Sequence, residues 1–221
     1  MKRIEHGGGL HLYPTLAFPR ARTLKVPPGW DCPEHLDNSG YCTPLESQGN
    51  NPWCAAYSMA QLLTASYWRE YHRKIDLPEA DIYAGAKKRD RITGDGTTLD
   101  AVMAAADRHD FGLGVTPTLA KERVLDATAV LFAVHKHGLV LVGMQISRGW
   151  EKLRPDGSIG TASGTLGGHA VLVSGYDLST GKIWGPNWWG RTWGRDGFWV
   201  MTLDQFTAQF AYGYAIRITW S

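Results

Sequence analysis

SQGNNPWCAAYS, residues 47–58, joins a turn-forming segment to the expected start of a long helix. Glycine, asparagine and proline at positions 49–52 favour a turn, and from Cys54 apolar residues recur at helical spacing as far as about Tyr71. At a helix N-terminus, main-chain N–H groups favour the thiolate form of a cysteine. Gln48 stands six residues before Cys54 and can offer a side-chain amide to the same site. The stretch therefore predicts a reactive cysteine beside a hydrogen-bond donor.

Two later motifs supply the other groups that a cysteine nucleophile needs. His169 follows Gly167 and Gly168 and opens the apolar run Ala-Val-Leu-Val, so we predict a histidine at the start of a strand. Asn187 follows another predicted strand and can hold the imidazole in one tautomer, and the neighbouring Trp189 can shield that hydrogen bond from water. The order of donor, nucleophile, base and orienting amide is that of cysteine-dependent acyl transfer.

Simpler interpretations compete with each of these assignments. A lone cysteine at the head of an apolar helix is more often a buried core thiol. Trp188, Trp189 and Trp193 can be core aromatics on a sheet, and we expect this for at least one of them. His135 and His137 stand two residues apart on a predicted helix, which is a poor spacing for a metal pair, so no metal site and no cofactor are predicted.

The composition is that of a compact globular protein. The 221 residues are 43% hydrophobic and 20% charged, with a net charge of +2, and no basic run with interleaved aromatics favours a nucleic-acid or membrane-surface partner. No apolar run approaches the roughly 20 residues that span a bilayer. No secretory signal is visible, so the localisation stays open between the cytoplasm and a signal-independent export route.

The pattern of periodicity predicts helices first and strands afterwards. Helices are expected at 54–71, 78–88, 97–112 and 126–136, and the strands at 139–146, 169–176, 182–186, 197–202 and 211–219, with a short helix at 203–210. A hairpin turn is expected at 177–181. This order indicates an α+β fold. The three cysteines, Cys32, Cys42 and Cys54, form no disulfide framework or zinc motif, and whether Cys32 and Cys42 pair is left open.

Several of these motifs together resemble the papain family of cysteine peptidases. The resemblance rests on residues 42–49 with 54–58, on Gly-His-Ala-Val at 168–171 followed by Gly-Tyr at 175–176, and on Asn-Trp-Trp-Gly at 187–190 with Trp-Gly at 193–194 and Gly-Phe at 197–198. Residues 27–31, Pro-Pro-Gly-Trp-Asp, resemble the start of a mature papain-like enzyme. The resemblance covers about residue 26 to the C-terminus, with four motifs in the family's order.

The resemblance implies a two-lobed fold in which a helical lobe packs against an antiparallel, β-barrel-like lobe with the active-site cleft between them. Residues 1–25 would be an N-terminal extension and 26–221 a single catalytic domain, with the helical lobe at about 46–125 and the β lobe at about 126–221 plus parts of 26–45. It also implies a hydrolase that needs no cofactor and acts on peptides or proteins, with a protein inhibitor or regulator as a further partner.

Each site residue takes a role by this resemblance. Cys54 would form a thioester, His169 would exchange the proton, Asn187 would orient His169, and Gln48 would complete the oxyanion hole. Gly96 is expected to pair its backbone with an extended substrate, with Gly168 and Trp189 beside it as further substrate-binding residues, although a helix-entry turn explains Gly96 equally well.

The sequence also departs from the family pattern. Trp53 precedes the cysteine and Ala55 follows it, as in the staphopains and other compact bacterial members, whereas a tryptophan usually follows. The cysteines of the family's common disulfide near the cleft are replaced by Asn51 and Thr93, and Pro52 stands in place of a usual glycine. These changes leave the expected chemistry intact and make the family's substrate preference a poor guide.

Two other functions remain as alternatives. A thiol acyltransferase or amidase would keep the thioester and change the acceptor or the substrate, but such families typically lack the glutamine before the cysteine and the Asn-x-Trp-Gly run. A catalytically inactive papain-fold protein could bind a partner, but it would have no need to keep Gln48, Cys54, His169 and Asn187 together.

Overall fold

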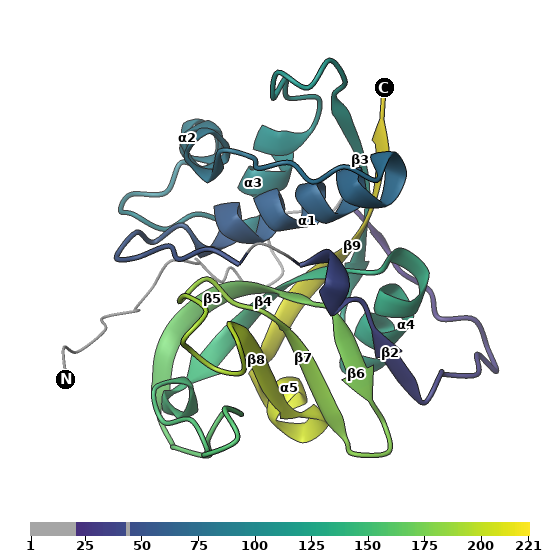
Figure 1. The fold of residues 1–221 in the computed structure, drawn as a ribbon, viewed down its shortest axis with the longest axis vertical. Coiled ribbons are helices and arrows are strands. Elements are labelled where there is room, and N and C mark those ends of the chain that lie inside the picture. Colours follow the sequence, from purple (N-terminus) through teal and green to yellow (C-terminus); the bar gives the residue numbers. More distant parts are fainter. Residues whose placement is uncertain (1–20, 43–44) are drawn as a thin grey trace.

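The computed structural model describes residues 21–42 and 45–221 and shows an α+β architecture (Figure 1). Most of the expected N-terminal extension lies outside the described residues, as do Thr43 and Pro44 of the first family motif. Within the described ranges, helices α1, α2 and α3 lie together above most of the strands in Figure 1, and the other two α-helices lie beside the sheets. The α+β fold class is confirmed.

The helical part contains α1 (Cys54–Tyr71), α2 (Glu79–Asp90) and α3 (Leu99–Ala106). Helix α1 is buried over most of its length, including Met59 and Leu63, because the other helices and the sheet strands both pack against it. Helix α3 starts where predicted, since the Thr98 side chain accepts a hydrogen bond from the Ala101 N–H.

The strands form two sheets that do not close into a barrel. The five-stranded sheet has the order β1-β3-β9-β4-β5, with bounds β1 Arg22–Thr23, β3 Pro117–Val124, β9 Phe210–Trp220, β4 Val140–Ser147 and β5 Thr165–Val173. The four-stranded sheet has the order β2-β6-β7-β8, with bounds β2 His35–Asp37, β6 Gly175–Asp177, β7 Lys182–Pro186 and β8 Phe198–Thr202. The predicted hairpin is present, because Asp177 pairs with Lys182 across the β6–β7 turn.

The remaining helices are α4 (Ala127–His137), α5 (Leu203–Gln209) and the 3-10 turns η1 (Ser39–Tyr41) and η2 (Arg148–Trp150). Asp126 caps α4, and Thr202 and Gln205 form a capping box at the start of α5. In each case the cap satisfies main-chain N–H groups that the first helical turn leaves unpaired. These caps explain why both helices begin where the sequence predicted.

Two hydrophobic cores stabilise the molecule. One surrounds α1 and includes residues of α2, α3, β4, β5 and β9, and the other fills the space between the sheets and α4 and α5. Trp150 and Trp199 are fully buried in the second core. The site described next lies on β5 between the two cores, since Ala170 and Leu172 face the first core and Val171 and Val173 face the second.

Several predictions of local structure need correction. Strands β1, β2 and β3 were not predicted, and β5 begins at Thr165, four residues before His169, because Thr165 to Gly168 already pair with β4.

All three cysteines are free, so Cys32 and Cys42 do not pair. Among the described residues, none of the helices combines the length and the apolarity that a membrane span requires.

Candidate active site

Cys54 is the first residue of α1 and is fully buried. The residue after His169, Ala170, donates its main-chain N–H to the Cys54 Sγ at 3.4 Å, so β5 lies directly against the thiol. The Cys54 carbonyl accepts from the Ser58 hydroxyl at 2.9 Å, and the Trp188 indole N–H donates to that hydroxyl at 3.0 Å. The first turn of α1 is thereby attached to the segment that carries Asn187.

The surroundings of the thiol act on its pKa in opposite directions. Burial raises the pKa of Cys54 to about 11, while the main-chain N–H groups of Ala170, Ala55 and Cys54 lower it. The helix N-terminus was expected to favour the thiolate, and in this arrangement burial outweighs it. Ionisation of the thiol near neutral pH therefore requires a positive charge beyond these main-chain groups.

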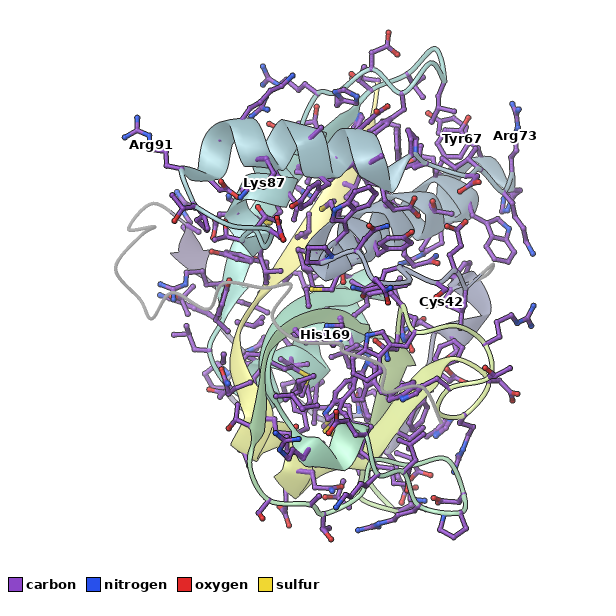
Figure 2. All side chains as sticks on the ribbon, turned by 90° about the vertical axis from the view of Figure 1, so that its left-hand side faces the viewer. Cys42, Tyr67, Arg73, Lys87, Arg91 and His169 are labelled. Atoms are coloured by element: carbon purple, nitrogen blue, oxygen red, sulfur yellow. The ribbon has the colours of Figure 1, made fainter. Side chains whose placement is uncertain are left out.

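His169 lies within β5 and is 4% exposed. Its Nε2 is 2.8 Å from the Asn187 Oδ1, and because a carbonyl oxygen only accepts, Nε2 carries the hydrogen. In the neutral ring the acceptor is then Nδ1. Asn187 is fully buried, directly after β7, so the two elements fix the ring between them. Figure 2 shows His169 on the strand below the helices.

Tryptophan rings surround the imidazole. Trp189 lies 5.1 Å from the His169 ring with a tilt of 33°, and Trp150 meets the same ring edge-on at 5.5 Å and 83°. Trp193 stacks on Trp150 at 5.6 Å, and the Trp150 indole N–H donates to the buried Gln209 Oε1 at 3.0 Å. These rings exclude water from the His169–Asn187 hydrogen bond, which strengthens it.

Gln48 lies beside the same region and is 7% exposed. Its main-chain N–H donates to the Trp188 carbonyl at 2.8 Å, and Ser47 forms a bridge with Trp189, so the glutamine segment is joined to the asparagine segment. The Gln48 Nε2 donates one hydrogen to the Asn51 carbonyl at 2.6 Å. The amide group has a second hydrogen, which is left for another acceptor.

The residues predicted to bind substrate lie in two places. Gly168 and Trp189 adjoin His169 along the chain and through ring contact, respectively. Gly96 is buried in the segment before α3, and its carbonyl accepts from the Lys87 ammonium at 3.0 Å. The contact with Lys87 fits the helix-entry turn that was the alternative explanation of Gly96.

Sequence reasoning did not find several residues of this arrangement. Trp150 and Gln209 are 59 positions apart, and no local pattern signals that they meet. Ser58 looked like one more helix residue, although its spacing of four from Cys54 is that of a hydroxyl that bonds back to a carbonyl in the preceding turn. No signal in the sequence points to the Ala170 N–H beyond its position directly after the predicted base, His169.

A cluster of carboxylates lies near the glutamine segment. Oxygen atoms of Glu46, Asp76 and Glu79 all lie within 4.8 Å of one another. Burial, together with the charges of Glu46 and Asp76, raises the pKa of Glu79 to about 7, and burial with the charge of Asp76 raises the pKa of Glu46. Such closely placed acids share protons, since they cannot all ionise without repulsion.

The fold and the placement of these groups define a protein with the papain-like, two-lobed fold. Xylellain, a cysteine protease from Xylella fastidiosa, matches with a TM-score of 0.78 and 17% identity over 98% of this chain and 98% of its own. Procathepsin B S9 from Trypanosoma congolense matches with a TM-score of 0.76 and 14% identity over 97% of this chain and 87% of its own. Digestive procathepsin L 3 from the larval midgut of Tenebrio molitor matches with a TM-score of 0.69 and 16% identity over 90% and 74%. No protein-family model and no curated protein sequence matches the chain.

Proposed function

We propose that this protein is a cysteine peptidase that hydrolyses peptide bonds through a thioester on Cys54. The observation that carries the proposal is the pair of hydrogen bonds around His169: its Nε2 binds Asn187, and the next residue, Ala170, donates to the Cys54 Sγ. With Nε2 bonded to Asn187, Nδ1 is the ring nitrogen that would accept the thiol proton in the proposed reaction. The papain-like fold shared with cysteine proteases supports the same reaction class.

The reaction follows from these positions. His169 takes the thiol proton as the Cys54 Sγ attacks the carbonyl carbon, and the resulting oxyanion accepts from the Cys54 main-chain N–H and from the free Gln48 amide hydrogen. His169 then gives its proton to the amine leaving group, and a thioester remains. Water deprotonated by His169 attacks the thioester, which releases the carboxylic acid and returns the proton to the thiol. Asn187 holds the ring throughout.

We further propose that an extended peptide or protein segment binds against Trp189 and Gly168, with the Gly96 backbone as an additional contact. An extended chain satisfies its polar groups by pairing with exposed backbone, and glycine lets the two main chains approach closely. A protein inhibitor or regulator would use the same surface, which agrees with the proforms among the matching structures.

The rival functions differ in their products. An acyltransferase would pass the acyl group from Cys54 to an amine rather than to water, and an amidase would release ammonia from a side-chain amide. An inactive binding protein would turn over no substrate. The buried His169–Asn187 bond favours turnover over mere binding, because a binding surface needs no imidazole held in a single tautomer.

The test combines chemical labelling with turnover. The protein is treated with a thiol-directed epoxysuccinyl inhibitor, the adduct is mapped by mass spectrometry, and hydrolysis of a casein-derived peptide library is compared with that of Cys54→Ala. We expect one adduct, at Cys54, and no detectable hydrolysis by the variant. Cys32→Ala is the matched control, because Cys32 is a free cysteine outside the site, and it should retain full activity.

The products separate these functions. New amino termini released in water support peptide-bond hydrolysis, free ammonia indicates an amidase, and products that form only with an added amine indicate an acyltransferase. An unlabelled Cys54 together with no turnover by the unmodified protein would reject catalysis and favour the binding module.

A further inference from the structure

Strand β9 pairs with β4 along its first half and with β3 from Gly213 onward, so only residues 213–215 have a neighbour on both sides. It pairs with β4 through the register that ends at Val140↔Ala215, and with β3 through the register that ends at Pro117↔Trp220. From Ile216 onward β9 therefore has an open edge on the side where β4 has ended. In Figure 1 this half of β9 rises beside β3 towards the C-terminus, beyond the reach of β4.

The directions of the main-chain groups on this edge follow from the register. Thr116 and Ser221 exchange hydrogen bonds of 2.8 and 3.1 Å, so they form a hydrogen-bonded pair. Because such pairs alternate along antiparallel strands, Thr219 and Arg217 also bond to β3, and Ile218 and Ile216 between them do not. The C=O group of Ile216 and both main-chain groups of Ile218 therefore point to the open side, whereas the Ile216 N–H faces the Leu139 carbonyl beside the last β4–β9 pair.

Independent contacts on the far side of β3 agree with this alternation. Leu119 lies opposite Ile218, and its N–H turns away from β9 to the Asp107 carboxylate at 2.9 Å. The Pro117 carbonyl likewise turns away from β9 and accepts from the Arg108 N–H at 2.7 Å. Within the described part of the chain, no hydrogen bond joins the Ile216 carbonyl or the main-chain groups of Ile218 to a residue outside β9.

A groove of about 470 Å³ runs along this open edge. We call it the β9 groove, and its apolar part is lined by Leu62 and Ala65 of α1, by Leu139, and by Ile216 and Ile218. Unpaired strand edges recruit additional strands unless they are covered or blocked by a charge that points inward, by proline or by a bulge. Residues 216–220 contain no proline and no bulge, and the exposed Arg217 points to the opposite face of the sheet from Ile216 and Ile218, so the edge can accept an extended chain.

The rim of the β9 groove is mainly cationic. Arg69, Lys136 and Arg217 line it, against a single carboxylate from Glu70. Lys136 has a loose contact of 4.0 Å with Glu122. Arg217 makes no ion pair within the described part of the chain.

The pKa of His137, at the end of α4, reflects the same excess of positive charge around the groove. His137 lines the groove, and its Nε2 is buried without a hydrogen-bond partner among the described residues. Burial lowers the pKa of His137, and the charges of Lys136, Arg217 and Arg69 lower it further against the opposing charge of Glu122. A negative group in the groove would satisfy that nitrogen and offset the repulsion.

We propose that the β9 groove binds an extended, acidic peptide segment of another protein, which adds to β9 as a further strand at Ile216 and Ile218. The Ile216 carbonyl and the main-chain groups of Ile218 would bond to the peptide backbone, and Arg217 and Lys136 would pair with its carboxylates. A second copy of this chain is a poor occupant, because two β9 edges brought together would place their cationic rims against each other. This surface is independent of the proposed peptidase site.

The test uses synthetic peptides and amide NMR at low salt. A ten-residue peptide that alternates threonine and glutamate is titrated into the labelled protein, beside the same peptide with lysine in place of glutamate. We expect the acidic peptide alone to shift the amide signals of Ile216, Ile218 and Leu139. Arg217→Glu should weaken its binding by about tenfold or more, since a favourable ion pair becomes a repulsive one. Arg154→Glu, an exposed arginine outside the groove, is the matched control and should change the affinity little.

The backbone contact is tested separately. Ile218→Pro removes a donor that β3 does not use, so the sheet should hold, and the affinity should fall by about tenfold for one lost hydrogen bond. Ile218→Val keeps the donor and should bind as the unmodified protein does, and thermal unfolding shows whether each variant is folded. Equal binding of a peptide methylated at alternate amides would overturn strand addition. Identical shifts with inorganic phosphate alone, or self-association that involves the same amides, would overturn the acidic-peptide assignment.

Discussion

The two sides of the candidate site are built in different ways. The cysteine side, residues 45–71, buries a thiol and holds Glu46 in a carboxylate cluster, so its ionisable groups are shifted away from their charged forms. The histidine side comprises β5, η2 and residues 187–199, and there a buried ring has an amide partner at 2.8 Å and two tryptophan neighbours. One side makes its nucleophile hard to ionise, and the other holds its base in one orientation.

This difference assigns the control of reactivity to the histidine side. With a pKa of about 11, the buried Cys54 would be almost entirely protonated at neutral pH. An imidazolium held beside it is the contribution that can reverse this, because a positive charge favours the thiolate directly. The helix N-terminus then acts as a supplement. The following predictions separate the two sides, from the largest expected effect to the smallest.

Replacement of His169 tests the difference most directly. His169→Ala should lower peptide hydrolysis by about 10⁴-fold, because the general base and the counter-charge of the thiolate are both lost. The thiol of this variant should titrate near its pKa of about 11, since burial then acts without an opposing imidazolium. The rate of alkylation by iodoacetamide as a function of pH measures this titration.

The control for this variant is His35→Ala, which removes an exposed histidine that contacts Asp177. It should alkylate and hydrolyse as the unmodified protein does. If His169→Ala still alkylated rapidly below pH 8, the cysteine side would ionise its thiol unaided and the assigned division of roles would be wrong.

Gln48 tests whether the cysteine side contributes to the transition state. Gln48→Ala should lower kcat by about 10²- to 10³-fold with little change in KM, as expected for a donor to a developing oxyanion. The pH dependence of alkylation should stay unchanged, because the amide carries no charge. Steady-state kinetics on one peptide gives both constants, and a rise in KM at constant kcat would make Gln48 a substrate-binding residue instead.

Asn187 tests how much the fixed imidazole matters. Asn187→Ala removes the acceptor of the His169 Nε2–H inside the tryptophan cluster, and activity should fall by about 10- to 100-fold for one buried hydrogen bond to a charged ring. Loss of that acceptor also disfavours the imidazolium, so the alkaline limb of the pH-rate profile should move to lower pH. Asn187→Gln keeps the amide group but moves it by one methylene, so it tests whether the position of the acceptor matters. An unshifted alkaline limb would mean that Asn187 serves packing alone.

The sequence predicted those elements whose residues carry their own local signals. Helix α1 matched its predicted bounds, because Gly49 and Pro52 precede a continuous periodic run, and β7 matched because glycines and turn residues surround it. Strand β3 was not predicted, because Lys121, Glu122 and Arg123 interrupt any alternation of apolar and polar residues. Its strand character comes from pairing with β9, about 95 residues later in the chain, which local propensity does not report.

The same reasoning applies to the candidate site. That Cys54, His169 and Asn187 lie in one region could be predicted, because each stands in a short motif with a recognisable chemical role. The environment of the His169 ring could not be predicted, since Trp150 reaches the ring through tertiary packing and is held by Gln209 on another element. The balance between burial and the main-chain N–H groups at the thiol also depends on packing, which the sequence does not report.

The smallest predicted effect concerns the charges on the cysteine side. Glu79 has a folded-state pKa of about 7, above the ordinary 4.5, so the folded state holds this proton more tightly than the unfolded state. The stability that this proton contributes is present below about pH 4.5 and is lost as the pH rises through 7. Glu79→Gln imitates the protonated acid, so it should stabilise the protein at pH 8 by about 1 kcal/mol, a value reduced because the group is half exposed and solvent-screened. Urea unfolding at pH 8 and at pH 4.5 measures the change, which should vanish at the lower pH. The exposed Glu70→Gln is the control, and a Glu79→Gln effect that were equal at both pH values would show that packing, rather than repulsion within the carboxylate cluster, sets the stability beside Gln48.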